Sequence, residues 1–554
     1  MKTNTHSCQQ PSQQQPCASG HQPSCSHPGQ QPCASGHQLC VIGLGYVGLP
    51  LARLFSTKYK TIGFDRNHNR VAEIMSGHDS TMELDERLLK EAIEKNGFLC
   101  TSELEKIKEC NIYIVAVPTP VDENNRPDLT PLIGASRTVG KVISPGDIVI
   151  YESTVYPGVT EEECIPIIEA ESGLTYNKDF YAGYSPERIN PGDKEHTVEK
   201  IKKVTSGSTP QVAEIVDNLY NSVLINGTHK APSIRVAEAS KIIENSQRDV
   251  NIAFMNELAK IFNAMGIDTR DVLEAASSKW NFIKMSPGLV GGHCISVDPY
   301  YLIQKAQVYG VLPRIMTSAR RLNDGMGAYV AEQTIKCMNK KGVLVKDSRI
   351  LILGITFKEN CPDTRNTKVL DIYHTLSEYT RNITIYDPWA NPDSVAREYG
   401  LTITPALPEL SVAGAAAGAG AGSGGELPAA CACGEVSAAC PVAGTASEVP
   451  AACPAAGAGV GSGGELPVAC AGGEVSAACP AADTASEVPA AAAGVAAEVP
   501  ASCPAAAAGK YDAIILAVAH NQFKDLNYKA LLAPNGIIYD VKGFLPREIV
   551  DARL

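Results

Sequence analysis

A cysteine between a pair of glycines and an aspartate is the feature of this sequence with the clearest chemical potential. Residues 288–301 read GLVGGHCISVDPYY, which places Cys294 directly after His293 and four residues before Asp298. Glycines let a backbone approach a ligand closely. A cysteine in such a loop can form a covalent acyl intermediate if a neighbouring group lowers its thiol pKa or accepts its proton. On this segment alone, an inert buried cysteine in a tight turn remains the alternative.

Polar residues at helical spacing lie upstream of this cysteine. Residues 234–266 show a broad apolar periodicity that predicts a long α-helix, and a second helix is expected near 269–278. Lys241, Asn245 and Arg248 are spaced i, i+4, i+7 and therefore line one stripe of the long helix. A solvated stripe is the ordinary interpretation for an isolated helix. Because this helix is mostly apolar and lies between two α/β segments, we expect the stripe to face a cleft.

The elements that must position these residues begin with a short apolar run at 39–42, typical of a buried parallel strand. A GxGxxG turn and an apolar-periodic helix follow directly, as a dinucleotide fingerprint requires. Its glycines are Gly43, Gly45 and Gly48. They allow the tight turn, the approach of a pyrophosphate and the packing of the helix, whose N-terminus faces the phosphates. The next predicted strand, 61–64, ends at Asp65, which favours NAD, although Arg66 leaves NADP open.

Three more predicted strands, at 111–117, 148–151 and 180–184, present polar residues where they end. The carboxyl ends of parallel strands form the edge at which ligands bind in open α/β sheets. The residues at these ends include Thr119, Glu152, Thr154, Glu187 and Arg188. Thr119 alone could be an ordinary turn hydroxyl, but three such ends in succession predict a cleft.

A second α/β unit follows the helices, without a GxGxxG turn. Its predicted strands are 349–354, 383–387, 511–518 and 536–540. The turn after the first strand offers Lys358 and Arg365, which suit a diphosphate as a point charge and a fork of donors. Surface salt bridging is the alternative that the local sequence leaves open.

Two segments differ in composition from these units. Residues 1–38 are rich in Gln, Ser, Pro and His and repeat QQPCASGHQ, which predicts a disordered tail. Residues 411–509 are rich in Ala, Gly and Pro, contain no Lys or Arg, and repeat GSGGELP at an offset of 39 residues. Stacked repeats need large apolar residues, which this segment almost lacks. We therefore predict a disordered acidic insertion in a surface connection of the second unit.

Composition excludes several classes of function. The net charge of −12 offers no basic surface for nucleic acid or an anionic membrane. No apolar run is long enough for a transmembrane helix, and the N-terminus lacks the apolar core of a signal peptide, so a cytoplasmic protein is expected. Of the 18 cysteines, 11 lie in the tail and the insertion, and no CxxC pair occurs, so no metal site is predicted.

In combination, these motifs resemble the nucleotide-sugar 6-dehydrogenase family, which includes UDP-glucose, GDP-mannose and UDP-N-acetylhexosamine dehydrogenases. The motifs are GLGYVGLP, AVPTP, ESTVYPG, SPERINPGD, the helix around ENSQRDVNIAFMNELA, PGLVGGHCISVDPYYL and LGITFKENCPDTRNT. The resemblance covers 39–410 and 510–554. SPERINPGD, the helix motif and GGHCISVDPYYL are most similar to the UDP-N-acetylglucosamine and UDP-N-acetylgalactosamine branch, which serves capsule and O-antigen synthesis.

The resemblance implies an α/β protein with two Rossmann-like domains joined by a long central helix. The expected domains are a tail at 1–38, an NAD-binding domain at 39–225, a central helical domain at 226–325 with the cysteine loop, a UDP-sugar-binding domain at 326–410 and 510–554, and the insertion at 411–509. A homodimer or higher homo-oligomer about the central helix is expected from the family only.

The resemblance also implies a four-electron oxidation. The C6 alcohol gives hydride to NAD⁺, Cys294 attacks the aldehyde, a second NAD⁺ takes a second hydride, and water hydrolyses the thioester. Two hydrides leave one carbon, so a nucleophile must hold that carbon at the acid oxidation level. In this scheme Lys241 and Asn245 stabilise oxyanions, Asp298 serves as or positions the base, and Glu187 and Thr119 act on the hydrolytic water, with Glu152 a weaker candidate.

The remaining expected roles are in binding. The cofactor-binding residues are Gly43, Gly45, Tyr46, Val47, Gly48, Asp65, Arg70, Thr119 and Thr154. The substrate-binding residues are Glu187, Arg188, Lys241, Arg248, Gly291, Gly292, His293, Phe357, Lys358 and Arg365. Phe357, Lys358 and Arg365 would grip the uracil and diphosphate, and the glycine loop would surround the sugar.

Three alternatives stay open. The first is a UDP-glucose or GDP-mannose 6-dehydrogenase, which a panel of substrates would distinguish. The second is a non-catalytic scaffold whose repetitive acidic segment does the work. The third is a two-electron dehydrogenase of the β-hydroxyacid type, which would form one NADH per substrate.

Overall fold

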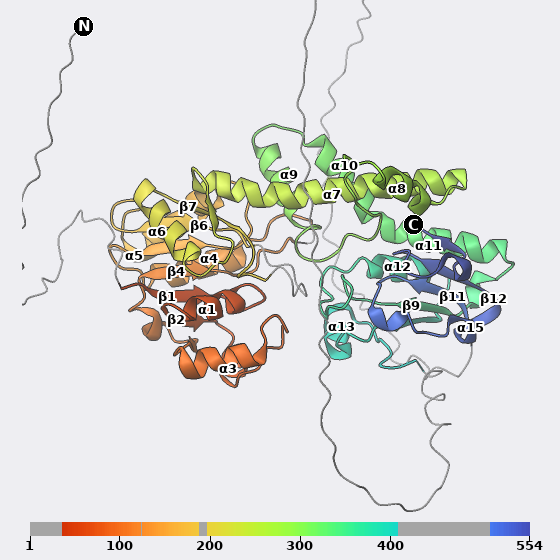
Figure 1. The fold of residues 1–554 in the computed structure, drawn as a ribbon, viewed down its shortest axis with the longest axis horizontal. Coiled ribbons are helices and arrows are strands. Elements are labelled where there is room, and N and C mark those ends of the chain that lie inside the picture. The colour runs from red at the N-terminus through yellow and green to blue at the C-terminus, as the bar shows by residue number, and fades with distance from the viewer. Residues whose placement is uncertain (1–35, 123, 188–196, 408–509) are drawn as a thin grey trace, which may run out of the picture. The chain divides into compact units, whose positions relative to one another are not determined.

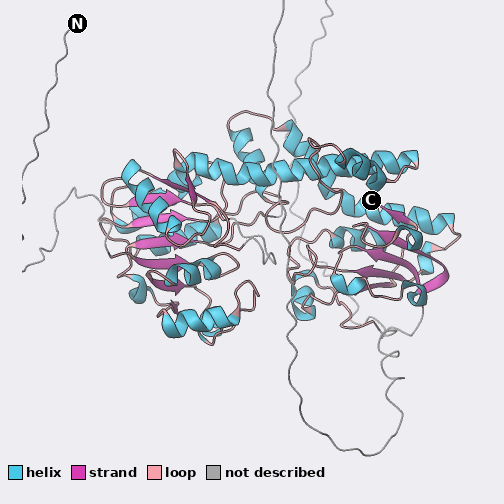
Figure 2. Ribbon diagram, in the orientation of Figure 1, coloured by secondary structure: helices cyan, strands magenta, loops and turns pink. Residues whose placement is uncertain are grey.

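The computed structural model describes residues 36–122, 124–187, 197–407 and 510–554 (Figures 1 and 2). The predicted insertion and nearly all of the predicted tail lie outside these residues. Arg188 also lies outside them. Within the described ranges, none of the helices combines the length and apolar character that crossing a bilayer requires.

The N-terminal sheet has eight strands in the order β3-β2-β1-β4-β5-β6-β7-β8. Neighbouring strands run parallel except β6 and β7, which are antiparallel. The strands are β1 (Gln38–Ile42), β2 (Lys60–Phe64), β3 (Leu99–Thr101), β4 (Ile112–Val115), β5 (Ile148–Tyr151), β6 (Tyr181–Tyr184), β7 (Lys203–Gly207) and β8 (Thr228–Lys230). The strand order reverses between β1 and β4, which is where a doubly wound sheet opens a crevice for a dinucleotide.

Helices cover both faces of this sheet. They are α1 (Gly48–Ser56), α2 (His68–Met75), α3 (Glu86–Lys95), α4 (Thr130–Gly140), α5 (Ile165–Ser172) and α6 (Pro210–Asn221). The apolar runs of the strands split between two cores. On β1, Cys40 and Ile42 pack into one core, whereas Leu39 and Val41 pack into the other. A strand buried on both faces needs apolar residues at every position, and for this reason the predicted strands read as continuous apolar runs.

The long helix α7 (Ile234–Met265) follows this sheet. Its first turn is capped by the Ser233 side chain, which accepts a hydrogen bond from Val236 N, and it ends at Gly266 with φ of 70°. The other helices of this region are α8 (Thr269–Ser277), α9 (Asp298–Val308), α10 (Arg314–Asp324) and α11 (Met326–Lys340). Helices α9 and α10 pack against α7 (Figure 1). The predicted apolar face of α7 is not all buried, since Ile243 and Phe254 are 55% and 54% exposed.

The second sheet has five parallel strands in the order β10-β9-β11-β12-β13. They are β9 (Ile350–Leu353), β10 (Ile383–Tyr386), β11 (Tyr511–Leu516), β12 (Leu532–Asp540) and β13 (Ala552–Arg553), with helices α12 (Val369–Ser377), α13 (Pro392–Tyr399) and α15 (Tyr528–Leu531). Strand β11, the first after residues 408–509, lies between β9 and β12, with Ala513 paired to Ile350. The long connection therefore leaves the centre of this sheet intact.

The predicted α/β class, with two Rossmann-like sheets and a long helix between them in the sequence, is confirmed. The predicted strand bounds differ from the observed ones by a few residues. Strand β4, for example, ends at Val115 rather than Val117, because the chain leaves the sheet there to form the polar turn that contains Thr119.

Candidate active site

Two cavities meet at Cys294. The first, of about 500 Å³, is lined by the polar stripe of α7, the loop 289–295 and residues of the second sheet's domain. The second, of about 270 Å³, is lined mainly by the turns that follow β4, β5 and β6. His293 and Cys294 line both cavities. A thiol at such a junction can react with a group held on one side while a second ligand approaches from the other.

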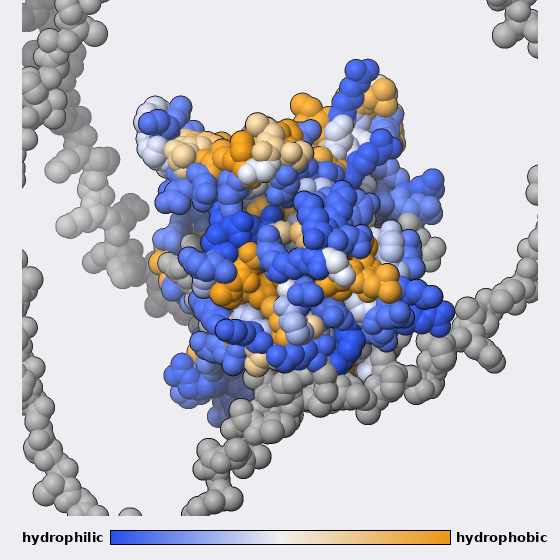
Figure 3. Space-filling model, turned by 90° about the vertical axis from the view of Figure 1, so that its right-hand side faces the viewer, coloured by the Kyte–Doolittle hydropathy of each residue, from blue (hydrophilic) through white to orange (hydrophobic). Residues whose placement is uncertain are grey.

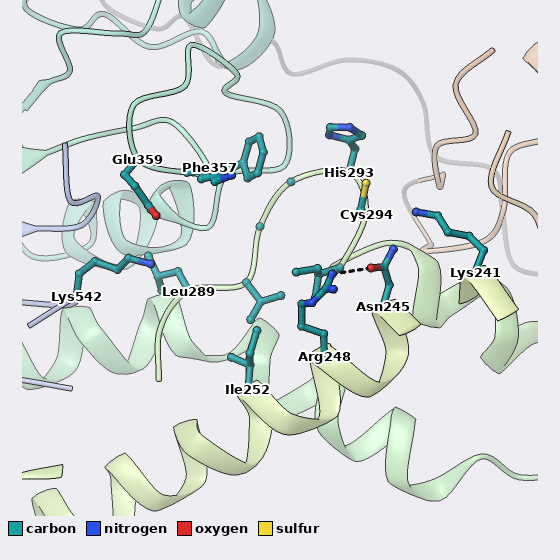
Figure 4. A pocket seen from close by; sticks show the side chains of 15 residues that line it. Lys241, Asn245, Arg248, Ile252, Leu289, His293, Cys294, Phe357, Glu359 and Lys542 are labelled. Atoms are coloured by element: carbon teal, nitrogen blue, oxygen red, sulfur yellow. Dashed lines mark hydrogen bonds between the residues drawn. The ribbon is translucent and has the colours of Figure 1, made fainter. Parts of the chain in front are cut away.

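The stripe of α7 lies as its spacing predicts. Lys241, Asn245, Arg248 and Ile252 follow one another along the helix and line the first cavity, facing the loop that carries Cys294 (Figure 4). Arg248 Nη1 donates a hydrogen bond to Asn245 Oδ1 at 3.0 Å. Because α7 rises about 1.5 Å per residue, this series offers ligand contacts along roughly 16 Å.

A cation and two carboxylates surround the thiol. Lys241 is buried, and its Nζ lies 3.2 Å from Glu187 Oε2 and 4.0 Å from Asp298 Oδ2. Asn245 Nδ2 donates to the same Asp298 oxygen at 2.6 Å. These contacts join α7 to the turn after β6 and to the first residue of α9. They hold a buried ammonium, an amide and two carboxylates within reach of one reacting centre.

Cys294 lies one turn before α9, since its carbonyl oxygen accepts the Asp298 N–H at 2.8 Å. Burial raises the pKa of the Cys294 thiol to about 12, Lys241 lowers it, and Glu187 and Asp298 raise it. The thiol is therefore protonated at neutral pH in this structure. Its reaction with an electrophile needs a group that takes the thiol proton or stabilises the product oxyanion, and Lys241 and Asp298 are placed for these tasks.

Two buried glutamates line the second cavity but differ in what their oxygens do. Both oxygens of Glu152 are engaged, one with Lys203 Nζ at 2.6 Å and the other with the Tyr220 hydroxyl at 2.5 Å. Burial nevertheless raises the pKa of Glu152. Glu187 Oε1, in contrast, is buried and has no hydrogen-bond partner among the described residues. Glu187 thus has one oxygen without a hydrogen-bond partner for a water or ligand, whereas each oxygen of Glu152 already accepts a hydrogen bond.

Thr119 and Thr154 also line this cavity. The Thr119 hydroxyl donates to the Thr154 carbonyl oxygen at 2.7 Å, which joins the turn after β4 to the turn after β5. The proton of this hydroxyl is therefore occupied, and its oxygen remains able to accept a hydrogen bond. Val47, from the glycine-rich turn, lines the same cavity.

The glycine-rich turn has the geometry that a dinucleotide requires. Gly43 has φ of 91°, and a Cβ on Gly48 would lie 1.7 Å from the Gly43 carbonyl oxygen. A Cβ on Gly45 would meet no atom within 4 Å, so open space lies beside that backbone. Asp65 Oδ2 accepts the Leu44 N–H at 2.9 Å, and Asp65 lines a further cavity of about 180 Å³ that also contains Gly43. The turn therefore fits a pyrophosphate, and Asp65 lies beside the space for a ribose.

Arg70, predicted to bind the cofactor, is held by contacts within the protein. It lines none of the cavities described here; its Nε donates to the Leu44 carbonyl oxygen, and its guanidinium pairs with Asp79 at 2.6 Å and Glu73 at 2.9 Å. These contacts join Arg70 to Leu44 of the glycine-rich turn and to two acids of the segment 73–79. Arg70 therefore supports the turn, and its contact with a cofactor stays a prediction.

Residues from the second sheet's domain close the first cavity. Phe357 and Lys358 line it, as does the glycine loop. Gly292 has φ of 81°, and a Cβ there would lie 2.7 Å from the Phe357 ring, whereas one on Gly291 would lie 2.7 Å from the Asn366 carbonyl oxygen. Only glycine permits this close packing of the loop on the domain.

Arg365 lies apart from Phe357 and Lys358, the other residues predicted to hold the nucleotide. It lines the second cavity and not the first, which contains Phe357 and Lys358. Asp363 holds its guanidinium through Nε at 2.9 Å and Nη2 at 2.6 Å and turns it over the Tyr46 ring, 4.6 Å from the ring centre. Arg365 thus lies beside the glycine-rich turn.

His293 lies between the two cavities. Its ring is 6.2 Å from that of Tyr46 and 6.0 Å from that of Phe357. Burial, reinforced by Arg365, lowers the pKa of His293, so the imidazole is neutral at neutral pH. This uncharged ring separates the two spaces beside Cys294.

Four residues of the first cavity were not predicted, namely Ile252, Ile295, Glu359 and Lys542. Lys542 had a signal in the sequence, because it follows the carboxyl end of β12, where ligands bind in a parallel sheet. Ile252 continues the α7 stripe four residues after Arg248. Glu359 had no distinguishing signal. No group of His, Cys, Asp and Glu in the described ranges has an arrangement that could hold a metal ion.

In a comparison with known protein families, three segments of the chain match known domains. All three belong to the UDP-glucose/GDP-mannose dehydrogenase family. Its NAD binding domain matches residues 37–224, its central domain 235–325 and its UDP binding domain 351–418.

Two relatives carry the name UDP-N-acetyl-D-glucosamine 6-dehydrogenase. The one from Pseudomonas aeruginosa is 60% identical over 364 residues, which are 66% of this chain and 86% of the relative. The one from Salmonella typhi is 58% identical over 363 residues, 66% and 85% of the two chains. Among solved structures, the UDP-D-ManNAc dehydrogenase from Pyrococcus horikoshii has a TM-score of 0.69 at 24% identity, over 93% of this chain and 98% of that one, which shows a shared fold.

Proposed function

Because this chain belongs to the UDP-glucose/GDP-mannose dehydrogenase family, we propose that it oxidises the C6 hydroxyl of UDP-N-acetylglucosamine to the carboxylate with two NAD⁺. Two relatives that are 58% and 60% identical are named UDP-N-acetyl-D-glucosamine 6-dehydrogenase, which supports this substrate. The product would be a UDP-N-acetylhexosaminuronic acid for capsule or O-antigen polysaccharide.

The observation that carries the proposal is the place of Cys294 at the junction of the two cavities. A UDP-sugar in the first cavity would bring C6 to the thiol, with the nucleotide toward Phe357, Lys358 and Lys542. The second cavity lies beside the glycine-rich turn, so it would hold the nicotinamide end of the cofactor. A four-electron oxidation needs this arrangement, because the carbon must stay attached to the protein between two hydride transfers.

NAD, when bound, accepts a hydride from C6 in each of the two oxidations. The protein's own residues transfer the protons and stabilise the oxyanion. Asp298 takes or relays the proton of the C6 alcohol. As Cys294 Sγ adds to the aldehyde, the forming C6 oxyanion is stabilised by the Lys241 ammonium and the Asn245 amide, and Asp298 relays the thiol proton to that oxygen, which gives the thiohemiacetal. Loss of the second hydride leaves a thioester on Cys294.

Hydrolysis of the thioester uses the second cavity. Glu187 Oε1 has no hydrogen-bond partner among the described residues and would accept one proton from an attacking water, while the Thr119 oxygen would accept a hydrogen bond from the other O–H of that water. Attack of this water on the thioester carbon breaks the C–S bond and gives the carboxylate and the free thiol. Both oxygens of Glu152 already accept a hydrogen bond, from Lys203 and from Tyr220, so Glu187 is the better placed of the two for this step.

We assign binding roles from the cavities, from the glycine-rich turn and, for Glu187, from its contact with Lys241. For the cofactor these residues are Gly43, Gly45, Tyr46, Val47, Gly48, Asp65, Thr119, Thr154 and, by its place beside Tyr46, Arg365. For the substrate they are Glu187, Lys241, Arg248, Gly291, Gly292, His293, Phe357, Lys358 and Lys542. We also propose an NAD-binding domain at 39–225, a central domain at 226–325 and a UDP-sugar domain at 326–410 and 510–554.

We also propose that the chain forms a homodimer or a higher homo-oligomer. An apolar stripe is exposed along one face of α7 at helical spacing, formed by Val236, Ile243, Phe254, Ile261 and Met265. Apolar side chains also gather at the upper edge of the face drawn in Figure 3. A second copy of the chain would cover the stripe, and light scattering of the purified protein would measure the assembly.

The test is the number of NADH molecules formed per UDP-N-acetylglucosamine consumed. We expect about two for the wild type, with a uronic acid product. Cys294→Ser should stall after the first oxidation, whereas Cys337→Ser, which changes a free cysteine of α11 outside both cavities, should behave as the wild type. One NADH per substrate in the wild type would indicate the two-electron alternative. Turnover of UDP-glucose alone would correct the substrate.

A further inference from the structure

One buried amide holds the beginning of the catalytic segment. Asn256, on α7, is 0% exposed. Its Nδ2 donates to the Gly288 carbonyl oxygen at 3.0 Å, and its Oδ1 accepts the Gly288 N–H at 2.8 Å. The side chain thus pairs with both backbone groups of one residue, which requires a donor and an acceptor in one planar group. Gly288 lies six residues before Cys294.

The same network continues to α10. Asn256 Nδ2 also donates to Asn323 Oδ1 at 2.8 Å, and Asn323 Nδ2 donates to Asp249 Oδ1 at 2.7 Å. Arg320 Nη1 donates to that Asp249 oxygen at 2.6 Å. Asp249, Arg320 and Asn323 are all buried, so each of these contacts is shielded from water.

The network also reaches the residues that follow the cysteine in the sequence. Arg320 Nη2 contacts Asp324 Oδ1 at 2.5 Å, and the Tyr300 hydroxyl donates to Asp324 Oδ2 at 2.6 Å. Tyr300 lies six residues after Cys294. One chain of polar contacts therefore holds both ends of the segment 288–300, whose middle carries the thiol.

We propose that this buried network, with Asn256 as its first member, positions Cys294 for attack on the C6 aldehyde. Asn256, Arg320 and Asn323 line neither cavity, so they act through the segment and not on the ligands. The segment contains Gly288, Gly291 and Gly292 and would otherwise sample many conformations. An error of about 1 Å in the place of a reacting group can lower a rate about 100-fold.

This inference rests on the proposed oxidation, and it predicts a change in the number of NADH molecules formed per substrate. If the thiol is misplaced, the first oxidation still occurs, but the aldehyde escapes before the thiohemiacetal forms. The first oxidation converts the alcohol to the aldehyde with one NADH and one proton, so the escaped aldehyde leaves the second NAD⁺ unused. A residue that contributed only to stability would not change this ratio in protein that remains folded.

The experiment compares Asn256→Ala with Asn263→Ala. Asn263 lies on the same helix, and its amide contacts only the Tyr329 hydroxyl among the described residues. For Asn256→Ala we expect the kcat of uronic acid formation to fall at least tenfold. NADH formed per substrate should fall from about two toward one, with the aldehyde trapped by hydroxylamine. The Kd of NAD⁺ should stay within twofold of the wild type. Asn263→Ala should match the wild type. A ratio of two with kcat within threefold of wild type would overturn the proposal.

Two further measurements separate this proposal from the proposed function. The rate at which iodoacetamide alkylates Cys294, followed by peptide mass spectrometry, needs no substrate. It should rise at least tenfold in Asn256→Ala and stay unchanged in Asn263→Ala, whatever the wild type oxidises. Should Asn256→Ala fail to fold, Tyr300→Phe releases the other end by removing one hydroxyl. We expect it to shift the alkylation rate and the NADH ratio in the same direction, and no shift in either would overturn the proposal.

Discussion

Replacement of Lys241 by methionine isolates the contribution of one buried charge to the reaction. Methionine keeps most of the length and the apolar stem of lysine but has no ammonium. In the structure this ammonium is the cation 3.2 Å from Glu187 and 4.0 Å from Asp298. Its removal changes the charge of these three groups from −1 to −2 beside Cys294.

The expected magnitude follows from this geometry. Loss of one donor to a developing oxyanion costs about 2.7–4 kcal/mol, or a factor of about 10² to 10³ in kcat. A unit charge at about 4 Å contributes about 4 kcal/mol at an effective dielectric constant near 20, so the electrostatic change alone can supply this loss. Since Lys241 lowers the pKa of Cys294, the variant's thiol should also titrate at higher pH.

Steady-state NADH formation with UDP-N-acetylglucosamine measures the first effect, and the pH profile of Cys294 alkylation measures the second. Lys260→Met is the matched control, because Lys260 lies on the same helix with its ammonium over the Tyr329 ring, outside the cavities. Thermal unfolding establishes that each variant is folded. If Lys241→Met kept kcat within threefold of wild type, the assignment of the oxyanion donor would be refuted.

Two predictions concern stability. Lys203→Met leaves Glu152 buried without its cation and should lower the free energy of unfolding by about 3–5 kcal/mol. Adding Glu152→Gln should recover part of this loss. Urea unfolding measures the change, and a loss below about 1 kcal/mol would contradict the prediction. Burial raises the pKa of Glu238 to about 7 against the opposing N–H groups of Gly158 and Thr160. The pKa of Glu238 in the folded protein thus lies above its ordinary value. The contribution of Glu238 to the free energy of unfolding is therefore fully present below about pH 4.5 and is lost as pH rises through about 7. Glu238→Gln should therefore show a smaller decrease of Tm between pH 5 and pH 8 than the wild type, and an unchanged decrease would count against the raised pKa.

The sequence predicted those parts of the protein that depend on residues close together in the chain. Short apolar runs predicted β1, β4, β5 and β9, because a strand buried on both faces must be apolar at every position. The glycine spacing predicted the turn after β1, since a side chain on Gly48 would collide with the Gly43 backbone. The stripe on α7 followed from the helical repeat alone.

Contacts between distant residues were outside the reach of such patterns. Arg365 and Lys358 come from the same turn and looked equivalent in sequence, but the fold turns Arg365 toward Tyr46 through Asp363. Nothing in the sequence indicated that Arg70 would pair with Glu73 and Asp79. The direction of a long flexible side chain depends on partners that only the folded chain supplies.

By itself, the sequence determined the two α/β units, the dinucleotide turn and the set of groups able to do the chemistry, because each rests on residues close together in the chain. The tertiary structure alone decided which of these groups meet. Lys241 and Glu187 are 54 residues apart, and Asn256 and Gly288 are 32 apart, yet each pair is in hydrogen-bond contact. Hydrogen bonds and charges act over a few ångströms in space, so their partners are set by packing and not by sequence spacing.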